Sequence, residues 1–183
     1  MFLDFEQASL AHLDAAYNLA YWLVRNRADA QDVVQDAYLR AFRARHSITG
    51  DDIKPWLLKI VRNVAFRWLA VRKRNANVIS FDAATGRDGI KSGILQVASE
   101  DPSAEDVLLG RAEQDLVRSA LTELPPAYRE VVVLREFEDL SYQDIAQITG
   151  APIGTVMSRL SRARGLLKTR LADLLAGDRK HAL

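Results

Sequence analysis

The sequence predicts an all-α protein made of two small helical domains that are joined by a flexible linker. Apolar residues recur at spacings of three and four through two blocks, which is the pattern of amphipathic helices. Between the blocks this periodicity stops and glycines accumulate, and no strand pair with a hairpin turn stands out. We therefore expect a first domain over 1–74, a linker over 75–104 and a second domain over 105–183.

The first block carries the spacing of three helices. One runs from Leu10 to Val24, and Asp29 can cap the second. Pro55 suits the first turn of the third helix, where a backbone N–H is not needed. The apolar stripes of the second and third helices would form a three-helix core: Ala30, Val33, Val34, Ala37, Tyr38, Ala41 and Phe42, then Leu57, Ile60, Val61, Val64, Trp68 and Leu69.

The second block ends in a predicted helix-turn-helix. Two earlier helices precede it, one closed by Pro125 and Pro126 and one that Pro126 can begin; their apolar positions are Val107, Leu116, Val117, Ala120, Leu121 and Leu124, then Tyr128, Val131, Val132 and Phe137. Ser141 and Asp144 then have the spacing of a capping box. Gly150 suits a left-handed turn between helices, and Val156 can fill the angle between them.

The last helix has a basic outer face. Between Thr155 and Arg170 there are five basic residues and no acidic one. In a helix-turn-helix the second helix enters the major groove, where arginine reads guanine. A solvated face on an ordinary helical hairpin is the alternative. Packing of the apolar stripe would leave these residues turned outward: Thr155, Ser158, Arg159, Arg162 and Lys168.

The third helix of the first block is also basic, with seven basic residues and no acidic one from Lys54 to Arg74. Its side chains at Lys59, Asn63 and Arg67 share one face. Aromatic residues interleave with the cations, as in sites that stack unpaired bases. Trp68 fits the apolar stripe, and Phe66 fits either role. A solvated face is again the alternative. The second helix is acidic over Asp29, Asp32, Gln35 and Asp36, which either repels DNA or complements the helix dipole.

Composition excludes several classes of function. The 25 Lys and Arg against 24 Asp and Glu give a net charge of +1, and the absence of cysteine excludes disulfides and thiol catalysis. We expect a cytoplasmic protein without a membrane span, a cofactor or a metal. An enzyme is not expected, because the three histidines are widely spaced and no phosphate-binding loop is present. The second block alone also fits a free-standing helix-turn-helix regulator that binds its operator as a dimer, and this is the main alternative interpretation of the chain.

Three stretches in this order resemble the extracytoplasmic-function (ECF) subfamily of the bacterial sigma-70 family of RNA polymerase sigma factors. They are DAQDVVQDAYLRAF, PWLLKIVRNVAFRWLAVRKR and ELPPAYREVVVLREFEDLSYQDIAQITGAPIGTVMSRLSRAR. The resemblance implies a region 2 domain that binds core polymerase and the minus-10 promoter element. It also implies a region 4 domain that reads the minus-35 element, and no enzymatic activity of the subunit itself.

The resemblance also assigns residues and partners. Core polymerase, through its β′ clamp helices and its β flap, would be one partner, promoter DNA the second, and an anti-sigma factor the third. The loop from His46 to Asp52 would hold a flipped base. Met157 stands where many relatives carry arginine. The implied sites are Asp32, Gln35, Asp36 and Arg40 for polymerase; Lys59, Arg62, Asn63, Phe66 and Arg67 for the minus-10 element; and Thr155, Met157, Ser158, Arg159, Ser161 and Arg162 for the minus-35 element.

Overall fold

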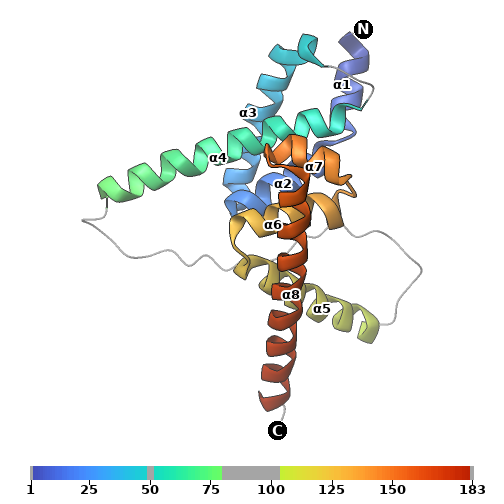
Figure 1. Ribbon diagram of the computed structural model, residues 1–183, viewed down its shortest axis with the longest axis vertical. Helices are drawn as coiled ribbons and strands as arrows, with labels where there is room; N and C mark the ends of the chain where they lie inside the picture. The colour runs from blue at the N-terminus through green and yellow to red at the C-terminus, as the bar shows by residue number, and fades with distance from the viewer. Residues whose placement is uncertain (1, 49–51, 80–103, 182–183) are drawn as a thin grey trace.

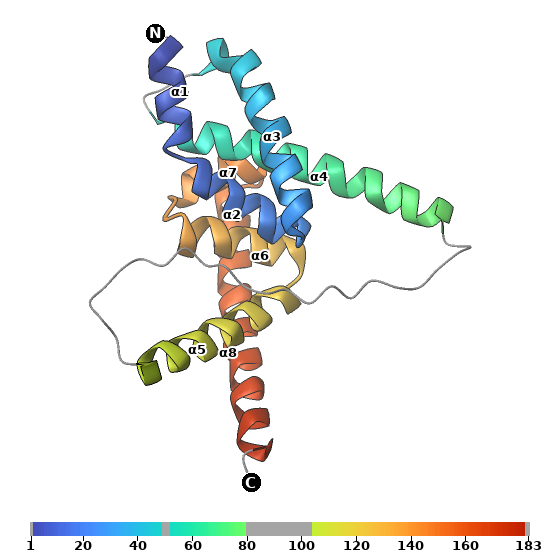
Figure 2. The same cartoon turned by 180° about the vertical axis from the view of Figure 1, so that it is seen from behind.

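The structure is a computed structural model, and it describes residues 2–48, 52–79 and 104–181. Every regular element in these ranges is helical, as the sequence predicts. The first block consists of α1 (Phe2–Leu10), α2 (Leu13–Val24), α3 (Arg27–Ala44), a 3₁₀ turn η1 (Arg45–Ser47) and α4 (Ile53–Ile79). Figure 2 shows α2 and α3 crossing in front of α4. The expected three-helix core is thus α2, α3 and α4.

The apolar stripes explain this packing. Val33 and Ala37 of α3 and Leu57 and Val61 of α4 are fully buried, as is Leu19 of α2. Small residues on α2 and α3 let the helices approach closely. Helix α1 covers one end of the bundle, where the ring of Phe5 lies 6.4 Å from the ring of Phe42 and 6.3 Å from that of Trp56.

Two expectations for the first block are wrong in detail. The helix expected from Leu10 to Val24 is interrupted, because the chain turns at Ala11 and His12 and Leu10 is 60% exposed. The cap of α3 is Asn26, whose side chain accepts a hydrogen bond from the backbone N–H of Asp29 at 3.0 Å. The helix therefore begins earlier than expected, and Asp29 lies within its first turn.

The second block consists of α5 (Ala104–Glu123), α6 (Pro126–Val132), a π-helical turn η2 (Val133–Phe137), α7 (Tyr142–Thr149) and α8 (Ile153–His181). Figure 1 shows α5 and α8 extending away from the first block, while α6 and α7 lie against it. Val117 and Phe137, which the periodicity assigned to apolar stripes, are 41% and 46% exposed and so are not core residues. Helix α4 continues to Ile79, past the expected boundary at 74, and the remaining linker positions 80–103 lie outside the described residues.

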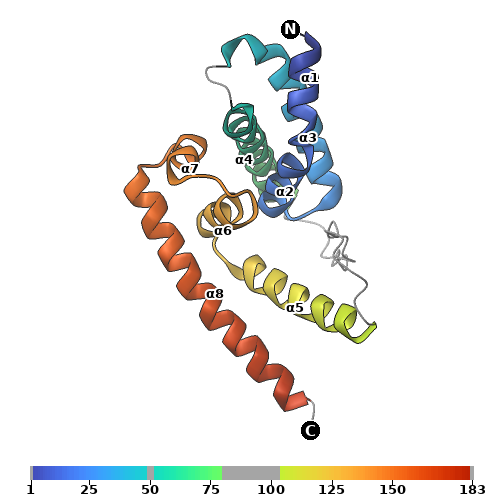
Figure 3. The ribbon, with the colours of Figure 1, turned by 90° about the vertical axis from the view of Figure 1, so that its right-hand side faces the viewer.

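The two blocks share one hydrophobic core. Helix α6 packs against α2, and α7 packs against α4. In the view of Figure 3, α4 is seen nearly end-on between α7 and the pair α2 and α3. Leu58 and Ala65, which lie beside the predicted stripe of α4, are therefore fully buried as well. Because the second block covers this further side of α4, candidate DNA-binding residues of the two blocks lie close together.

Candidate nucleic-acid interface

The five candidate minus-10 residues of α4 lie on two different faces. Lys59, Asn63 and Arg67 are exposed and follow one another at intervals of four, so they form a single polar row. Arg62 and Phe66 are half-buried and lie on the side that the second block covers. The guanidinium of Arg62 stacks over the ring of Phe66, with 4.5 Å from its carbon to the ring centroid. The exposed row is thus the part of this set that is accessible to DNA.

Arg62 forms an ion pair with Glu130 of α6. Its Nε bonds Oε1 of Glu130, and its Nη2 lies 3.4 Å from Oε2. The Glu130 side chain is only 1% exposed. Burial raises the pKa of Glu130, whereas the hydrogen bond and charge of Arg62 and the charge of Arg159 oppose that rise. A candidate minus-10 residue and a candidate minus-35 residue therefore act on the same carboxylate.

The helix-turn-helix forms as its turn chemistry predicts. The Ser141 hydroxyl accepts from the N–H of Asp144 at 3.1 Å, and the Asp144 carboxylate accepts from the N–H of Ser141 at 3.3 Å. Gly150 ends α7 with a φ of 68°, where glycine avoids the strain of other residues. Val156 is fully buried between the two helices. Local interactions thus fix the direction in which α8 leaves α7.

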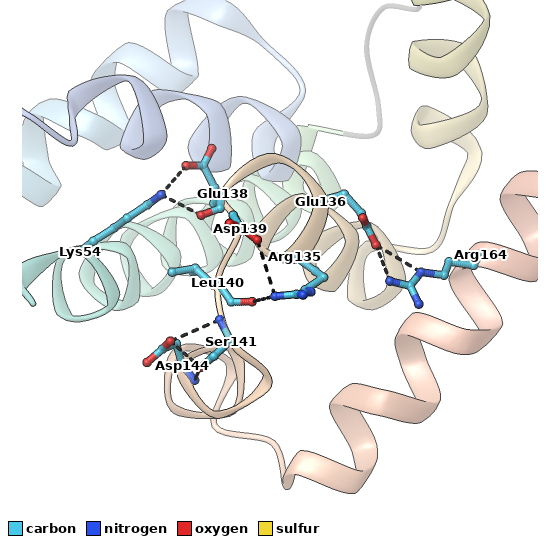
Figure 4. A network of polar contacts seen from close by, with 9 residues as sticks. All are labelled: Lys54, Arg135, Glu136, Glu138, Asp139, Leu140, Ser141, Asp144 and Arg164. Atoms are coloured by element: carbon cyan, nitrogen blue, oxygen red, sulfur yellow. Dashed lines mark hydrogen bonds and ion pairs between the residues drawn. The ribbon is translucent and has the colours of Figure 1, made fainter.

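The first turns of α8 present most of the candidate minus-35 residues to solvent. Ser158, Ser161 and Arg162 are exposed, and Met157 is 51% exposed. Thr155 and Arg159 are half-buried. The neighbouring basic residue Arg164 has a different environment, because its guanidinium pairs with Glu136 at 2.6 Å (Figure 4). The accessible group with the chemistry for a bidentate contact to guanine is therefore Arg162.

The candidate polymerase-binding residues form a separate surface on α3. Asp32 and Gln35 are exposed, and Asp36 pairs with Arg40 one turn away at 2.9 Å. Asp29, nearer the start of the helix, pairs with Arg72 of α4 at 2.6 Å. The acidic surface therefore includes two carboxylates that already have partners, whereas Asp32 extends into solvent. This surface belongs to the first block alone.

Comparison with known proteins assigns both blocks. Residues 10–75 match the family described as Sigma-70 region 2, and residues 114–167 match Sigma-70, region 4. The ECF RNA polymerase sigma-E factor of Escherichia coli strain K12 is 33% identical over 148 residues, which are 80% of this chain and 76% of that protein. The chain belongs to the ECF sigma factors.

Further relatives agree with this assignment. The ECF RNA polymerase sigma factor SigE of Mycolicibacterium smegmatis is 33% identical over 162 residues. These are 88% of this chain but only 59% of the length of that relative. The sigma factor RpoE from Bartonella quintana, solved in complex with the anti-sigma factor NepR, has a TM-score of 0.75 and 29% identity. That match covers 92% of this chain and 97% of the other. CnrH, solved with the cytosolic domain of CnrY, shares the fold at a TM-score of 0.57.

As an ECF sigma factor, the chain is a transcription initiation factor with a DNA-binding region 4 rather than a classical enzyme. Sigma factors bind RNA polymerase and promoter DNA. Among the described residues, no three His, Asp or Glu side chains gather closely enough to hold a metal ion. Within those same ranges, no helix combines the length and apolarity that crossing a membrane requires.

An apolar groove of the region 2 domain adjoins the polymerase-binding candidates. It lies between α1 and α3, has a volume of about 400 Å³, and includes Gln35 in its lining. The hydroxyl of Tyr38 donates to the carbonyl of Ser9 at 2.7 Å, which ties the two helices together beside the groove. Leu39 and Phe42 are exposed there. Sequence periodicity placed Phe42 in the core, but this residue is 41% exposed and lines the groove instead.

Sequence reasoning missed three residues that contact the region 2 domain, namely Arg129, Glu130 and Glu138. All three are buried. The guanidinium of Arg129 donates to four carbonyl oxygens, three from the end of α5 and one from Trp22 near the end of α2. Burial lowers its pKa to about 10, and the nearby charge of Arg25 adds to this. The sequence did indicate that the helix that carries Arg129 and Glu130 is buried. The four residues from Val131 to Leu134 are all apolar, and a helix that is apolar on every side is buried on every side.

Proposed function

We propose that this sigma factor binds core RNA polymerase and places its two domains on the minus-10 and minus-35 elements of a promoter. Region 2 contacts polymerase through α3, and the exposed row of α4 captures the unpaired strand. Region 4 contacts the β flap and reads the minus-35 element through the first turns of α8. Because bacterial polymerase works in the cytoplasm, we propose the same location for this protein.

The observation that carries this proposal is the separation of three surfaces on one chain. The acidic and apolar surface of α3 suits a protein partner, because exposed apolar patches mark protein contacts and carboxylates repel DNA. The row of Lys59, Asn63 and Arg67 suits a single strand. The exposed Arg162 near the start of α8 suits a major groove. A free-standing regulator has no use for the first two surfaces.

The mechanism needs no chemistry on the sigma factor itself. Its residues position DNA, and the polymerase supplies the active site. A flipped base costs a few kcal/mol of lost pairing and stacking, which contacts from α4 and from the loop over 46–52 offset. Positions 49–51 of that loop lie outside the described residues.

We also propose control by an anti-sigma factor. Support comes from the Bartonella RpoE, whose solved structure contains the anti-sigma factor NepR and matches this chain over nearly its full length. A partner that binds both domains, or either one, would prevent polymerase from using them.

In vitro transcription with core RNA polymerase on a promoter library tests the proposed function. The purified chain should direct initiation from a shared pair of elements, and it should bind duplex DNA only weakly without polymerase. Tight, sequence-specific duplex binding as a dimer, without any transcription by the added polymerase, would instead establish the free-standing regulator.

A further inference from the structure

The start of α8 carries two exposed apolar side chains. Ile153 is 46% exposed and Met157 is 51% exposed. Because they lie four residues apart, they are neighbours on one side of the helix. Single exposed apolar residues are common on protein surfaces and need no function. These two, however, lie at the end of the helix that a helix-turn-helix inserts into the major groove. Their position therefore suits a contact with base edges.

Buried residues of α8 fix the direction in which Met157 points. Val156, Leu160 and Ala163 are at most 1% exposed, and they hold one side of the helix against the rest of region 4. The first turn is regular, since the N–H of Val156 donates to the carbonyl of Pro152 at 3.1 Å. At 3.6 residues per turn, Met157 lies about 100° around the helix from Val156. It therefore points outward, and in Figure 3 α8 runs along one edge of the molecule.

The neighbours of Met157 on this outer side are small. Gly154, Ser158 and Ser161 are all exposed. A Cβ added at Gly154 would meet nothing within 4 Å, so the space beside Met157 is open. The thioether of Met157 therefore stands above a surface of glycine and serine. A base edge that approaches α8 can contact this side chain without displacing any other.

An apolar side chain discriminates between bases in only one way. The C5-methyl of thymine is the apolar group that the major groove presents, and the other base atoms there are hydrogen-bond donors and acceptors. A thioether placed against such a polar atom would remove it from water and leave it without a partner, which costs free energy. Methionine is also flexible and polarizable, so it adapts its shape to a methyl group. The chemistry of Met157 thus favours thymine.

We propose that Met157, with Ile153 beside it, reads the C5-methyl of one thymine in the minus-35 element. The sigma factor then prefers an A·T pair at that position. This inference rests on the proposed function, because it concerns how α8 reads the same element. Met157 and Arg162 are five residues apart, which is about 7.5 Å along the helix. Base pairs are about 3.4 Å apart, so the thymine lies about two base pairs from a guanine that Arg162 reads.

Replacement of single thymines in the DNA tests this proposal on the full chain with core polymerase. Selection from a promoter library first identifies the minus-35 element. Each thymine of that element, on either strand, is then replaced by deoxyuridine, which still pairs with adenine and lacks only the C5-methyl. At one thymine, this change should weaken promoter binding about fourfold, the value for burying one methyl group. Because the change is made in the DNA, folding of the protein is not affected.

Three variants assign the methyl contact to Met157. Met157→Gln keeps the length of the side chain but replaces the thioether with a polar amide, so it should bind the thymine and deoxyuridine templates equally. Met157→Leu remains apolar and should still prefer thymine. Leu175→Ala is the matched control, since it removes a side chain that is 50% exposed near the other end of α8. This variant should keep the fourfold preference of the wild type.

Several results overturn the reading of a methyl group. Equal binding of thymine and deoxyuridine templates by the wild type at every position would exclude it, as would a selected minus-35 element without thymine. A Met157→Gln protein that still distinguishes the two templates would assign the contact to another residue. Absence of transcription with core polymerase would overturn the proposed function and this inference together. Normal transcription with equal binding of both templates would overturn this inference alone.

Discussion

Arg129 and Trp22 are joined by a hydrogen bond of 3.0 Å, from the guanidinium Nη1 to the main-chain carbonyl oxygen, although 107 residues separate them in sequence. The other donors of Arg129 bond Leu121, Thr122 and Leu124 around the end of α5. The carbonyl ends of two helices, one from each domain, therefore meet at one cation. Helix C-termini carry partial negative charge, so this buried guanidinium is neutralised without a carboxylate.

Replacement of Arg129 by Met should destabilise the protein by about 2 to 4 kcal/mol, because four buried carbonyls lose a charged donor. For a chain of this size, each kcal/mol corresponds to about 2 to 4 °C in Tm. Thermal unfolding followed by circular dichroism measures the change. The matched control is Arg43→Met, which removes an exposed arginine of α3 and should leave Tm nearly unchanged.

Substitution of Asp32 and Asp36 by Arg should abolish association with core polymerase while the fold remains intact. Both side chains lie outside the apolar stripe of α3, and loss of the exposed Asp36–Arg40 pair costs about 0.3 to 0.5 kcal/mol. Co-purification with polymerase reports the association, and unfolding curves report the fold. If the doubly substituted protein still co-purifies in full amount, the assignment of α3 as the docking surface is wrong.

Replacement of Arg162 by Ala should weaken minus-35 recognition by about 1 to 3 kcal/mol if the guanidinium bonds a guanine. Selection from a promoter library should then show a relaxed preference at one base pair. A phosphate contact predicts equal weakening for every sequence instead. Arg164→Ala is the control, since that arginine is held by Glu136 and is not among the proposed base contacts. If Arg162→Ala changes neither measurement, α8 has only a solvated basic face there.

Replacement of both Asn63 and Arg67 by Ala should impair open-complex formation more than closed-complex binding. Contacts to a flipped base exist only after the duplex opens, whereas region 4 binds intact DNA. Permanganate footprinting of thymines measures melting on matched templates and on templates with a pre-melted minus-10 bubble. The bubble should partly rescue the variant, because the cost of unpairing has already been met.

Arg72→Ala is the control for that experiment. Arg72 lies on the same helix but pairs with Asp29, so melting should be close to normal. Equal loss on matched and bubble templates by the double variant would limit Asn63 and Arg67 to a role in binding or folding.

Sequence alone determined the helices, the helix-turn-helix and the family. These features depend on local chemistry: the periodicity of α3 and α4, the capping box of Ser141 and Asp144, and the left-handed turn at Gly150. The interaction partners in each case lie within a few residues of one another. Errors at this level were also local, such as the cap at Asn26 and the break before Leu13.

Only the tertiary structure decided which candidate DNA-binding residues are exposed and which form ion pairs with the other domain. The partner of Arg62 is 68 residues away, and that of Lys54 is 84 residues away, so no spacing rule relates them. A basic helix face looks the same in sequence whether it meets solvent, DNA or a carboxylate of another domain. Packing of α6 and α7 on α2 and α4 chose between these possibilities, because it buried Glu130 and Glu138 where cations of region 2 form their ion pairs.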